Sequence, residues 1–162
     1  MDTRTDRSTL ETTRTHNPQS TAQIAGHPIH PMLIPFPIVF FVSTLLCDLV
    51  FLSTGNPDWA RATLWLLGAG LVMSALAALA GLTDFLSESR IRNLDAAWWH
   101  GGGNVLAVLI SLYNFYIRYE IGGTSVSTTG VILSAIVVLI FLFTGWKGWE
   151  MVYRHHVGVA DQ

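Results

Sequence analysis

Two histidines, each followed by a proline, stand where a polar N-terminal segment gives way to the first long apolar run. They are His27 and His30, in the motif Gly-His-Pro-Ile-His-Pro at residues 26–31. Proline disfavours the α region for the residue before it, so both histidines are predicted to lie in extended backbone. Polyproline II has about three residues per turn, so side chains three apart point the same way. The motif therefore predicts two imidazoles presented together, which suits binding of a metal ion or of haem iron.

Further polar groups lie at the ends of other apolar runs and could join these two histidines. His100 and Asn104 are four residues apart, so they share one helical face and Asn104 could orient His100. The candidate metal ligands are His27, His30, Asp84, His100 and His155; the candidate cofactor-binding residues are His27, His30, His100, Asn104, Arg154 and His155. The spacing alone is no zinc signature, because His-Glu-x-x-His and Cys-x-x-Cys motifs are absent.

Four apolar stretches are long enough to cross a membrane and could position these groups. They cover about residues 33–52, 62–82, 98–117 and 129–149; about 20 helical residues span a hydrocarbon core of about 30 Å. Residues 1–25 are polar and are expected to be disordered. The expected fold is all-α, a four-transmembrane-helix antiparallel bundle over residues 26–159.

The basic residues predict the orientation of this bundle. With four spans, seven of the nine fall on the side of the two termini, and cytoplasmic segments carry such an excess. The seven are Arg4, Arg7, Arg14, Arg90, Arg92, Lys147 and Arg154, against Arg61 and Arg118. We therefore expect both termini and the His/Asp cluster on the cytoplasmic side of the membrane.

Composition excludes several other classes of protein. Of the 162 residues 51% are hydrophobic and 12% are charged, with a formal net charge of −2. A nucleic-acid partner is not expected, because phosphate binding needs a concentrated basic face. Cys47 is the only cysteine, which rules out a thiolate cluster within one chain.

Chemistry within the spans is sparse. Asp48 lies one turn from the end of the first span and is expected to reach the interface or to accept hydrogen bonds from N–H groups, with a functional role as the alternative. No internal repeat or mid-span charge favours a transporter. No serine or threonine in the spans has an adjacent histidine at helical spacing, so we expect no enzymatic activity from the chain alone, and a metal-dependent reaction stays open.

Several motifs together resemble those of a family of small bacterial four-helix membrane proteins, known as a domain of unknown function. They are the motif at residues 26–31, Gly-Leu-Thr-Asp at 81–84, His100 with Asn104, and Tyr-Arg-His-His-Val-Gly-Val at 153–159. The resemblance covers about residues 24–159. Relatives are sometimes fused to Rieske iron–sulfur or cytochrome-type domains, which implies a redox setting. In that family the last histidine is usually followed by glycine; His156 occupies the glycine position, which leaves its role open.

Three functions remain open on these grounds. The first is a redox-linked haem b module, which would hold a single haem near the cytoplasm and exchange electrons with an iron–sulfur or cytochrome protein. The second is a non-haem site for a divalent transition metal. The third is a structural or interaction subunit without a cofactor, in which the polar cluster is a hydrogen-bonded plug. The bilayer is the expected partner in all three, with a homo-oligomer as a further form of assembly.

Overall fold

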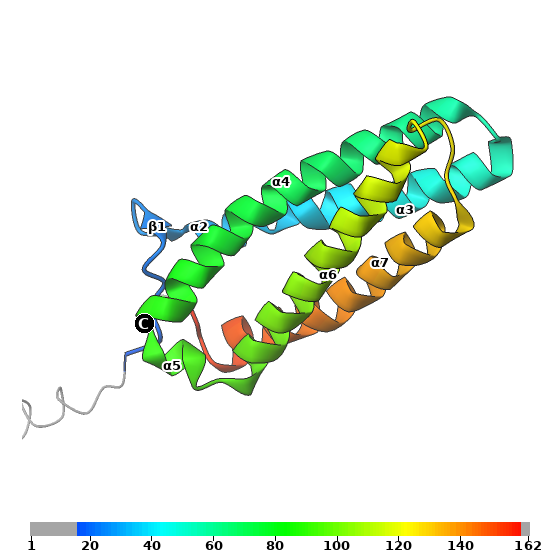
Figure 1. The fold of residues 1–162 in the computed structure, drawn as a ribbon. Coiled ribbons are helices and arrows are strands. Elements are labelled where there is room, and N and C mark those ends of the chain that lie inside the picture. The colour runs from blue at the N-terminus through cyan, green and yellow to red at the C-terminus, as the bar shows by residue number, and fades with distance from the viewer. Residues whose placement is uncertain (1–15, 160–162) are drawn as a thin grey trace, which may run out of the picture.

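Helices make up most of the part of the chain that the computed structural model describes, residues 16–159 (Figure 1). Each of four long helices, α3, α4, α6 and α7, overlaps one predicted span. The elements are β1 (Gln23–Ile24), β2 (His27–Pro28), α2 (Ile29–Leu33), α3 (Pro35–Thr54), α4 (Pro57–Ser87), α5 (Ser89–Arg92), α6 (Asp95–Glu120), α7 (Thr128–Trp149) and the π-helical turn η1 (Glu150–Arg154).

Short-range signals begin and end the long helices. Gly55 ends α3 with φ +64°, a left-handed conformation that favours glycine. The Asn56 side chain then accepts a hydrogen bond from the Asp58 N–H at 2.9 Å and caps α4. In the same way the Ser127 hydroxyl accepts from the Gly130 N–H at 3.0 Å and caps α7. These caps place two short connections at one end of the bundle.

The four long helices pack around one core (Figure 1). Both α3 and α6 contact α4 and α7, so α3 lies diagonally across from α6, and α4 across from α7. The core centres on one residue from each long helix: Phe41, Leu67, Ala107 and Val137. Both ends of the described chain lie at the end of the bundle opposite to the two short connections (Figure 1).

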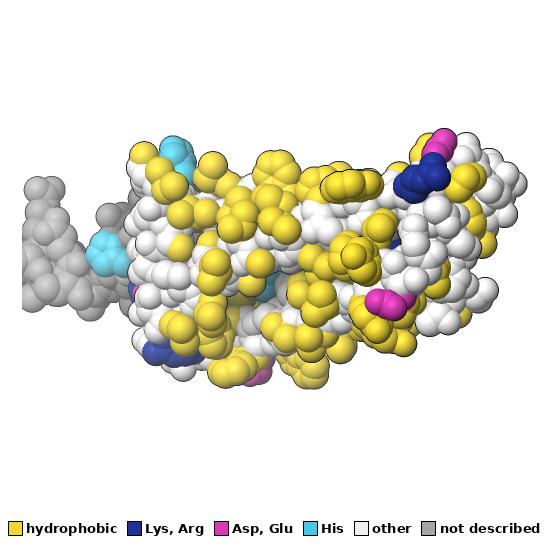
Figure 2. Space-filling model, turned by 45° about the horizontal axis from the view of Figure 1, so that its top comes forward, with side chains coloured by type: hydrophobic (Ala, Val, Ile, Leu, Met, Phe, Trp, Pro, Cys, Tyr) yellow, Lys and Arg dark blue, Asp and Glu magenta, His cyan; other side chains and the backbone are white. Residues whose placement is uncertain are grey.

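The surface of the bundle is apolar, whereas many of its buried residues are small or polar. Trp65 is 79% exposed, and leucine, isoleucine, valine and aromatic side chains are exposed along every long helix. Figure 2 shows hydrophobic side chains spread over the flank, with charged side chains towards the two ends. Apolar flanks suit a hydrocarbon solvent, and small buried residues let helices approach closely. This is the pattern of a membrane protein.

Three helical stretches are long and apolar enough to cross a membrane: residues 29–54, 57–87 and 128–154. The helix that corresponds to the predicted span 98–117, α6, is not among them. It is long enough, but two asparagines and three consecutive glycines lower its hydropathy. Asn114 and Arg118, two of its polar side chains, are buried in the bundle.

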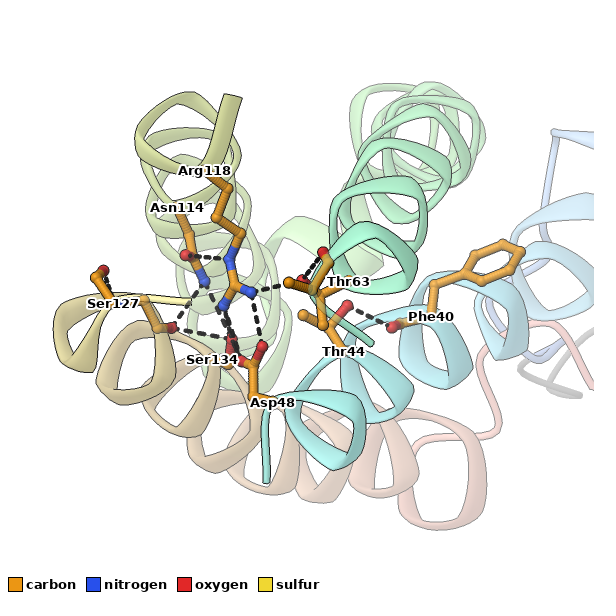
Figure 3. Close-up of polar contacts among 10 residues, drawn as sticks. Phe40, Thr44, Asp48, Thr63, Asn114, Arg118, Ser127 and Ser134 are labelled. Atoms are coloured by element: carbon orange, nitrogen blue, oxygen red, sulfur yellow. Dashed lines mark hydrogen bonds and ion pairs between the residues drawn. The ribbon is translucent and has the colours of Figure 1, made fainter. Parts of the chain in front are cut away.

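A buried ion pair joins the diagonal helices α3 and α6 near the end with the short connections (Figure 3). Asp48 is 0% exposed and Arg118 is 1% exposed. The two guanidinium Nη atoms donate to the two carboxylate oxygens at 2.6 and 2.8 Å. This bidentate geometry is the strongest form of the Arg–carboxylate interaction.

All five N–H donors of Arg118 have partners (Figure 3). Besides the two bonds to Asp48, Nε donates to Asn114 Oδ1 at 2.9 Å, and Nη1 donates to the Thr63 hydroxyl at 2.7 Å. Nη2 donates to the Ser134 hydroxyl at 3.2 Å, and that hydroxyl donates to Asp48 at 2.8 Å. Each long helix thus contributes at least one side chain to one saturated network.

This network decides between the two placements that the sequence allowed for Asp48. The carboxylate is buried and accepts N–H groups, which belong to the Arg118 side chain. Both residues lie inside the bundle because each supplies the other's counter-charge, which neither could find alone in an apolar setting.

We predict that Asp48→Asn destabilises the protein by about 3–5 kcal/mol, because it leaves the Arg118 charge buried and unpaired. Unfolding in detergent would measure the loss. The matched control is Asp58→Asn, whose ion pair with Arg61 is exposed and should contribute about 1 kcal/mol or less. Replacing both partners, Asp48→Leu with Arg118→Met, should cost less than Asp48→Asn. Equal stability of Asp48→Asn and Asp58→Asn would contradict the assignment.

Candidate functional site at the histidine end

The motif at residues 26–31 begins as a two-residue hairpin. Ile24 in β1 pairs with His27 in β2, and the turn between them has positive φ at Ala25 (+50°) and Gly26 (+81°). Two successive positive φ values define the tight turn that best matches strand twist, which explains the glycine. His27 is exposed on the second strand.

The backbone then changes from strand to helix, which separates the two histidines. His27 lies in extended backbone, as predicted, but His30 is the second residue of α2. The prediction is wrong for His30 because Pro31 falls in the first helical turn, where its missing N–H has no intrahelical partner to lose. His30 therefore turns into the bundle, where its Nδ1 lies 2.8 Å from the carbonyl oxygen of Ala77 in α4.

His100 is fixed in the same manner from the opposite side. Its Nδ1 lies 2.8 Å from the carbonyl oxygen of Thr144 in α7. The Asn104 amide contacts it as well, with Nδ2 at 2.8 Å from the His100 carbonyl and 3.2 Å from Nε2. The Thr144 hydroxyl donates to Asn104 Oδ1 at 3.1 Å, which fixes the orientation of the amide. The predicted contact between His100 and Asn104 is confirmed.

These contacts define which ring nitrogen carries hydrogen. A carbonyl oxygen only accepts, so Nδ1 is the donor in both His30 and His100. The amide N–H directed at Nε2 of His100 agrees with a lone pair there. The two rings meet edge to face, with centroids 6.0 Å apart. The two imidazoles therefore lie side by side, each donating from Nδ1, and in the neutral form of each ring Nε2 carries the lone pair.

Glycines make room for both rings. A Cβ atom on Gly81 would lie 2.9 Å from Nδ1 of His30, and one on Gly148 would lie 3.2 Å from the His100 ring. At Gly103 a Cβ would lie 2.5 Å from the Thr144 side chain. The close approach of helices that these glycines permit is what brings the carbonyl acceptors within reach of the histidines.

The remaining predicted ligands are not brought to this pair. Both oxygens of Asp84 accept hydrogen bonds from the segment Ser20–Ala22. The His155 N–H donates to the carbonyl of Glu150, and the Arg154 guanidinium donates to the Glu150 carboxylate at 2.9 Å. Within residues 16–159, no group of three or more His, Cys, Asp or Glu side chains is placed to hold a metal ion.

The tail predicted to be disordered up to residue 25 is ordered from residue 16. The Pro18 carbonyl accepts from the Gly158 N–H at 2.8 Å, and the Asn17 amide donates to the Val159 carbonyl at 3.2 Å. Polar composition did not prevent order, because hydrogen bonds to the rest of the chain replace a core. Residues 1–15 lie outside the described part.

His156 has φ +53°, which explains why glycine suits this position.

Charged and aromatic side chains around this end also have partners of their own. The Arg90 side chain donates to Glu88 and lowers the pKa of that carboxyl to about 2. The Arg92 guanidinium donates to the carbonyl oxygen of Phe85 at 3.0 Å. Trp98, Trp99, Trp146 and Trp149 are exposed on the flank, as expected for an aromatic belt.

Sequence reasoning found the two histidines and the amide, but missed what holds them. The acceptors are backbone carbonyls of Ala77 and Thr144, which no side-chain motif reveals. One usable signal is present in the sequence: Ala77 and Gly81 belong to a stripe of small residues on α4, along which another element can pack closely.

We predict that Gly81→Ala displaces His30, because the added methyl group would lie within 3 Å of its ring. The hydrogen-bonded Nδ1–H signal of His30 in ¹⁵N NMR should be lost, while that of His100 persists. Gly101→Ala is the matched control, because nothing lies within 4 Å of its added Cβ; it should gain up to about 1 kcal/mol from helix propensity. An unchanged His30 signal in Gly81→Ala would refute this packing.

The comparisons with known proteins agree with the membrane pattern. The chain matches the family model described as a predicted membrane protein (DUF2231) over residues 26–161. No curated protein and no solved structure shows a significant match. The match begins at Gly26 of the histidine motif and includes all four long helices. The chain therefore belongs to this family of predicted membrane proteins.

Proposed function

We propose that all four long helices cross the bacterial inner membrane as an antiparallel bundle, with both termini in the cytoplasm. The hydrogen bonds between residues 17–18 and 158–159 support an even number of crossings, because they hold the two ends of the described chain together. The polar side chains that lower the hydropathy of α6 are satisfied inside the bundle. Among residues 16–159, four of the six basic residues, Arg90, Arg92, Lys147 and Arg154, lie on the proposed cytoplasmic side.

We further propose that His30 and His100 bind haem b iron and that the protein is a redox-linked membrane module. One observation carries this proposal: two imidazoles with ring centroids 6.0 Å apart each bond a carbonyl oxygen through Nδ1, which leaves Nε2 of each ring as the nitrogen that could bind a metal. A metal held by protein alone usually needs three or four ligands. Haem iron needs only one or two axial ligands from the protein.

The residues present fit this chemistry. His30 and His100 would hold the metal through Nε2, because Nδ1 of each ring is engaged with a backbone carbonyl and the two rings are neighbours. The Asn104 contact with Nε2 of His100 is long, at 3.2 Å, so a metal could replace it. When bound, haem would supply one-electron chemistry; the chain's own residues would orient the two imidazoles and exclude water.

The position of the pair indicates the side on which electrons would enter and leave. The opposite end holds the saturated Asp48–Arg118 network and no histidine among the described residues. A single haem near the cytoplasm would therefore exchange electrons with an iron–sulfur or cytochrome protein on that side. A non-haem transition metal at the same imidazoles is the alternative, and a structural pair without cofactor is the third.

The proposed topology predicts the labelling of single cysteines in a Cys47→Ser background. In intact cells, a membrane-impermeant maleimide should label Thr54→Cys, at the exposed end of α3, and Ser125→Cys, in the connection between α6 and α7. It should label Ser89→Cys only after lysis. If α6 does not cross the membrane, Ser125→Cys and Ser89→Cys will behave alike, and the four-span topology fails.

For the cofactor, we predict a Soret shift and sharp α bands in the dithionite-reduced minus oxidised spectrum of protein purified in mild detergent after expression with adequate haem and iron. His30→Ala and His100→Ala should each abolish or strongly shift these bands, because each removes an axial nitrogen. His27→Ala is the matched control and should retain them, since His27 is exposed. A featureless spectrum from folded protein rejects haem, and elemental analysis then separates a metal site from a structural pair.

A further inference from the structure

The geometry points to a role for Asp84 that differs from metal binding: it is a positioning residue that sets the place of His30 through the segment Ser20–Ala22. As a statement about His30 as an axial ligand, this inference rests on the proposed function. The geometric part concerns the protein without any ligand and can be tested by itself.

The Asp84 carboxylate collects donors from three successive residues. The backbone N–H groups of Thr21 and Ala22 both donate to Oδ1 at 2.7 Å. The Ser20 hydroxyl lies 3.0 and 2.9 Å from the two carboxylate oxygens, and Ser20 is only 6% exposed. The Thr21 hydroxyl adds a longer contact at 3.3 Å. Short bonds from N–H groups to an ionised carboxylate are among the strongest hydrogen bonds in proteins.

One residue transmits this anchoring to the histidine. Ala22 donates its N–H to Asp84, and its carbonyl accepts the Ile29 N–H at 2.8 Å. Ile29 is the first residue of α2 and directly precedes His30. The hairpin β1–β2 closes the loop between Ala22 and Ile29. Two hydrogen bonds therefore connect the Asp84 carboxylate to the backbone next to His30.

The face of α4 that carries Asp84 also contacts the His30 ring. Ala77, Gly81 and Asp84 are spaced i, i+4 and i+7, so they line one face of the helix over about 10 Å. Ala77 offers its carbonyl to the His30 ring, Gly81 gives the ring space, and Asp84 holds the preceding segment. Loss of the Asp84 contacts would leave His30 with a ring bond but with a backbone free to move.

Asp84→Asn tests this role, because an amide keeps the size of the side chain but puts an N–H₂ group where an acceptor is needed. We expect two changes in detergent-solubilised protein without added ligand. Hydrogen exchange at residues 20–29 should become about 10-fold faster or more. The hydrogen-bonded Nδ1–H signal of His30 should broaden or disappear, while that of His100 stays. Asp58→Asn, at the other end of α4, is the matched control and should change neither.

These two measurements test the positioning role of Asp84 independently of whether the protein binds haem. Faster exchange at residues 20–24 with an unchanged His30 ring signal would show that Asp84 only anchors the tail, and would overturn the proposal. If Asp84→Asn does not fold, Ser20→Ala removes only the hydroxyl contacts, and the same two measurements apply. If the protein binds no haem but the ring signal behaves as expected, the proposed function fails and the positioning role stands. In pigmented protein, Asp84→Asn should also shift the haem midpoint potential, with partial recovery in Asp84→Glu.

Discussion

The buried Asp48–Arg118 ion pair is the interaction on which the arrangement of the four long helices depends. A charge without a partner is very costly inside an apolar bundle, so each of the two residues requires the other. They come from diagonal helices, and their remaining hydrogen bonds reach the other two. One register of the four helices satisfies every donor of Arg118, and a shift by one residue in any helix would break part of the network. The pair thus specifies a single packing, which the apolar contacts alone would define only weakly.

The two polar regions of the bundle differ in one physical respect. In the Asp48–Arg118 network all five guanidinium donors have acceptors, so Arg118 has no N–H group left for a ligand. At the histidine end, Nδ1 of each imidazole is engaged and Nε2 of His30 has no partner among the described residues. The core residues Phe41, Leu67, Ala107 and Val137 lie between these regions. The first region stabilises the fold, and the second holds reactive nitrogen atoms at defined positions.

The sequence was sufficient for the four long helices, because an apolar run of about 20 residues with caps and turn residues has few alternative structures. It was also sufficient for the contact between His100 and Asn104, which depends only on helical spacing. It failed for His30, whose conformation depends on whether Pro31 enters a helix. It failed for Asp48 and Arg118 because their pairing joins residues 70 positions apart. Asp84 was assigned to the histidines for its position at a helix end, and only the fold reveals that residues 20–22 reach it first.

The contact between residues 17–18 and 158–159 has a consequence for modular architecture. Because the two ends of the folded region lie together, a soluble domain joined to either end would emerge at the same face of the bundle. That face is the one formed by the hairpin, Asp84 and the histidine pair. The same domain could therefore be attached to the N-terminal or to the C-terminal end. Its distance from the imidazoles would differ between the two arrangements by no more than the length of its linker.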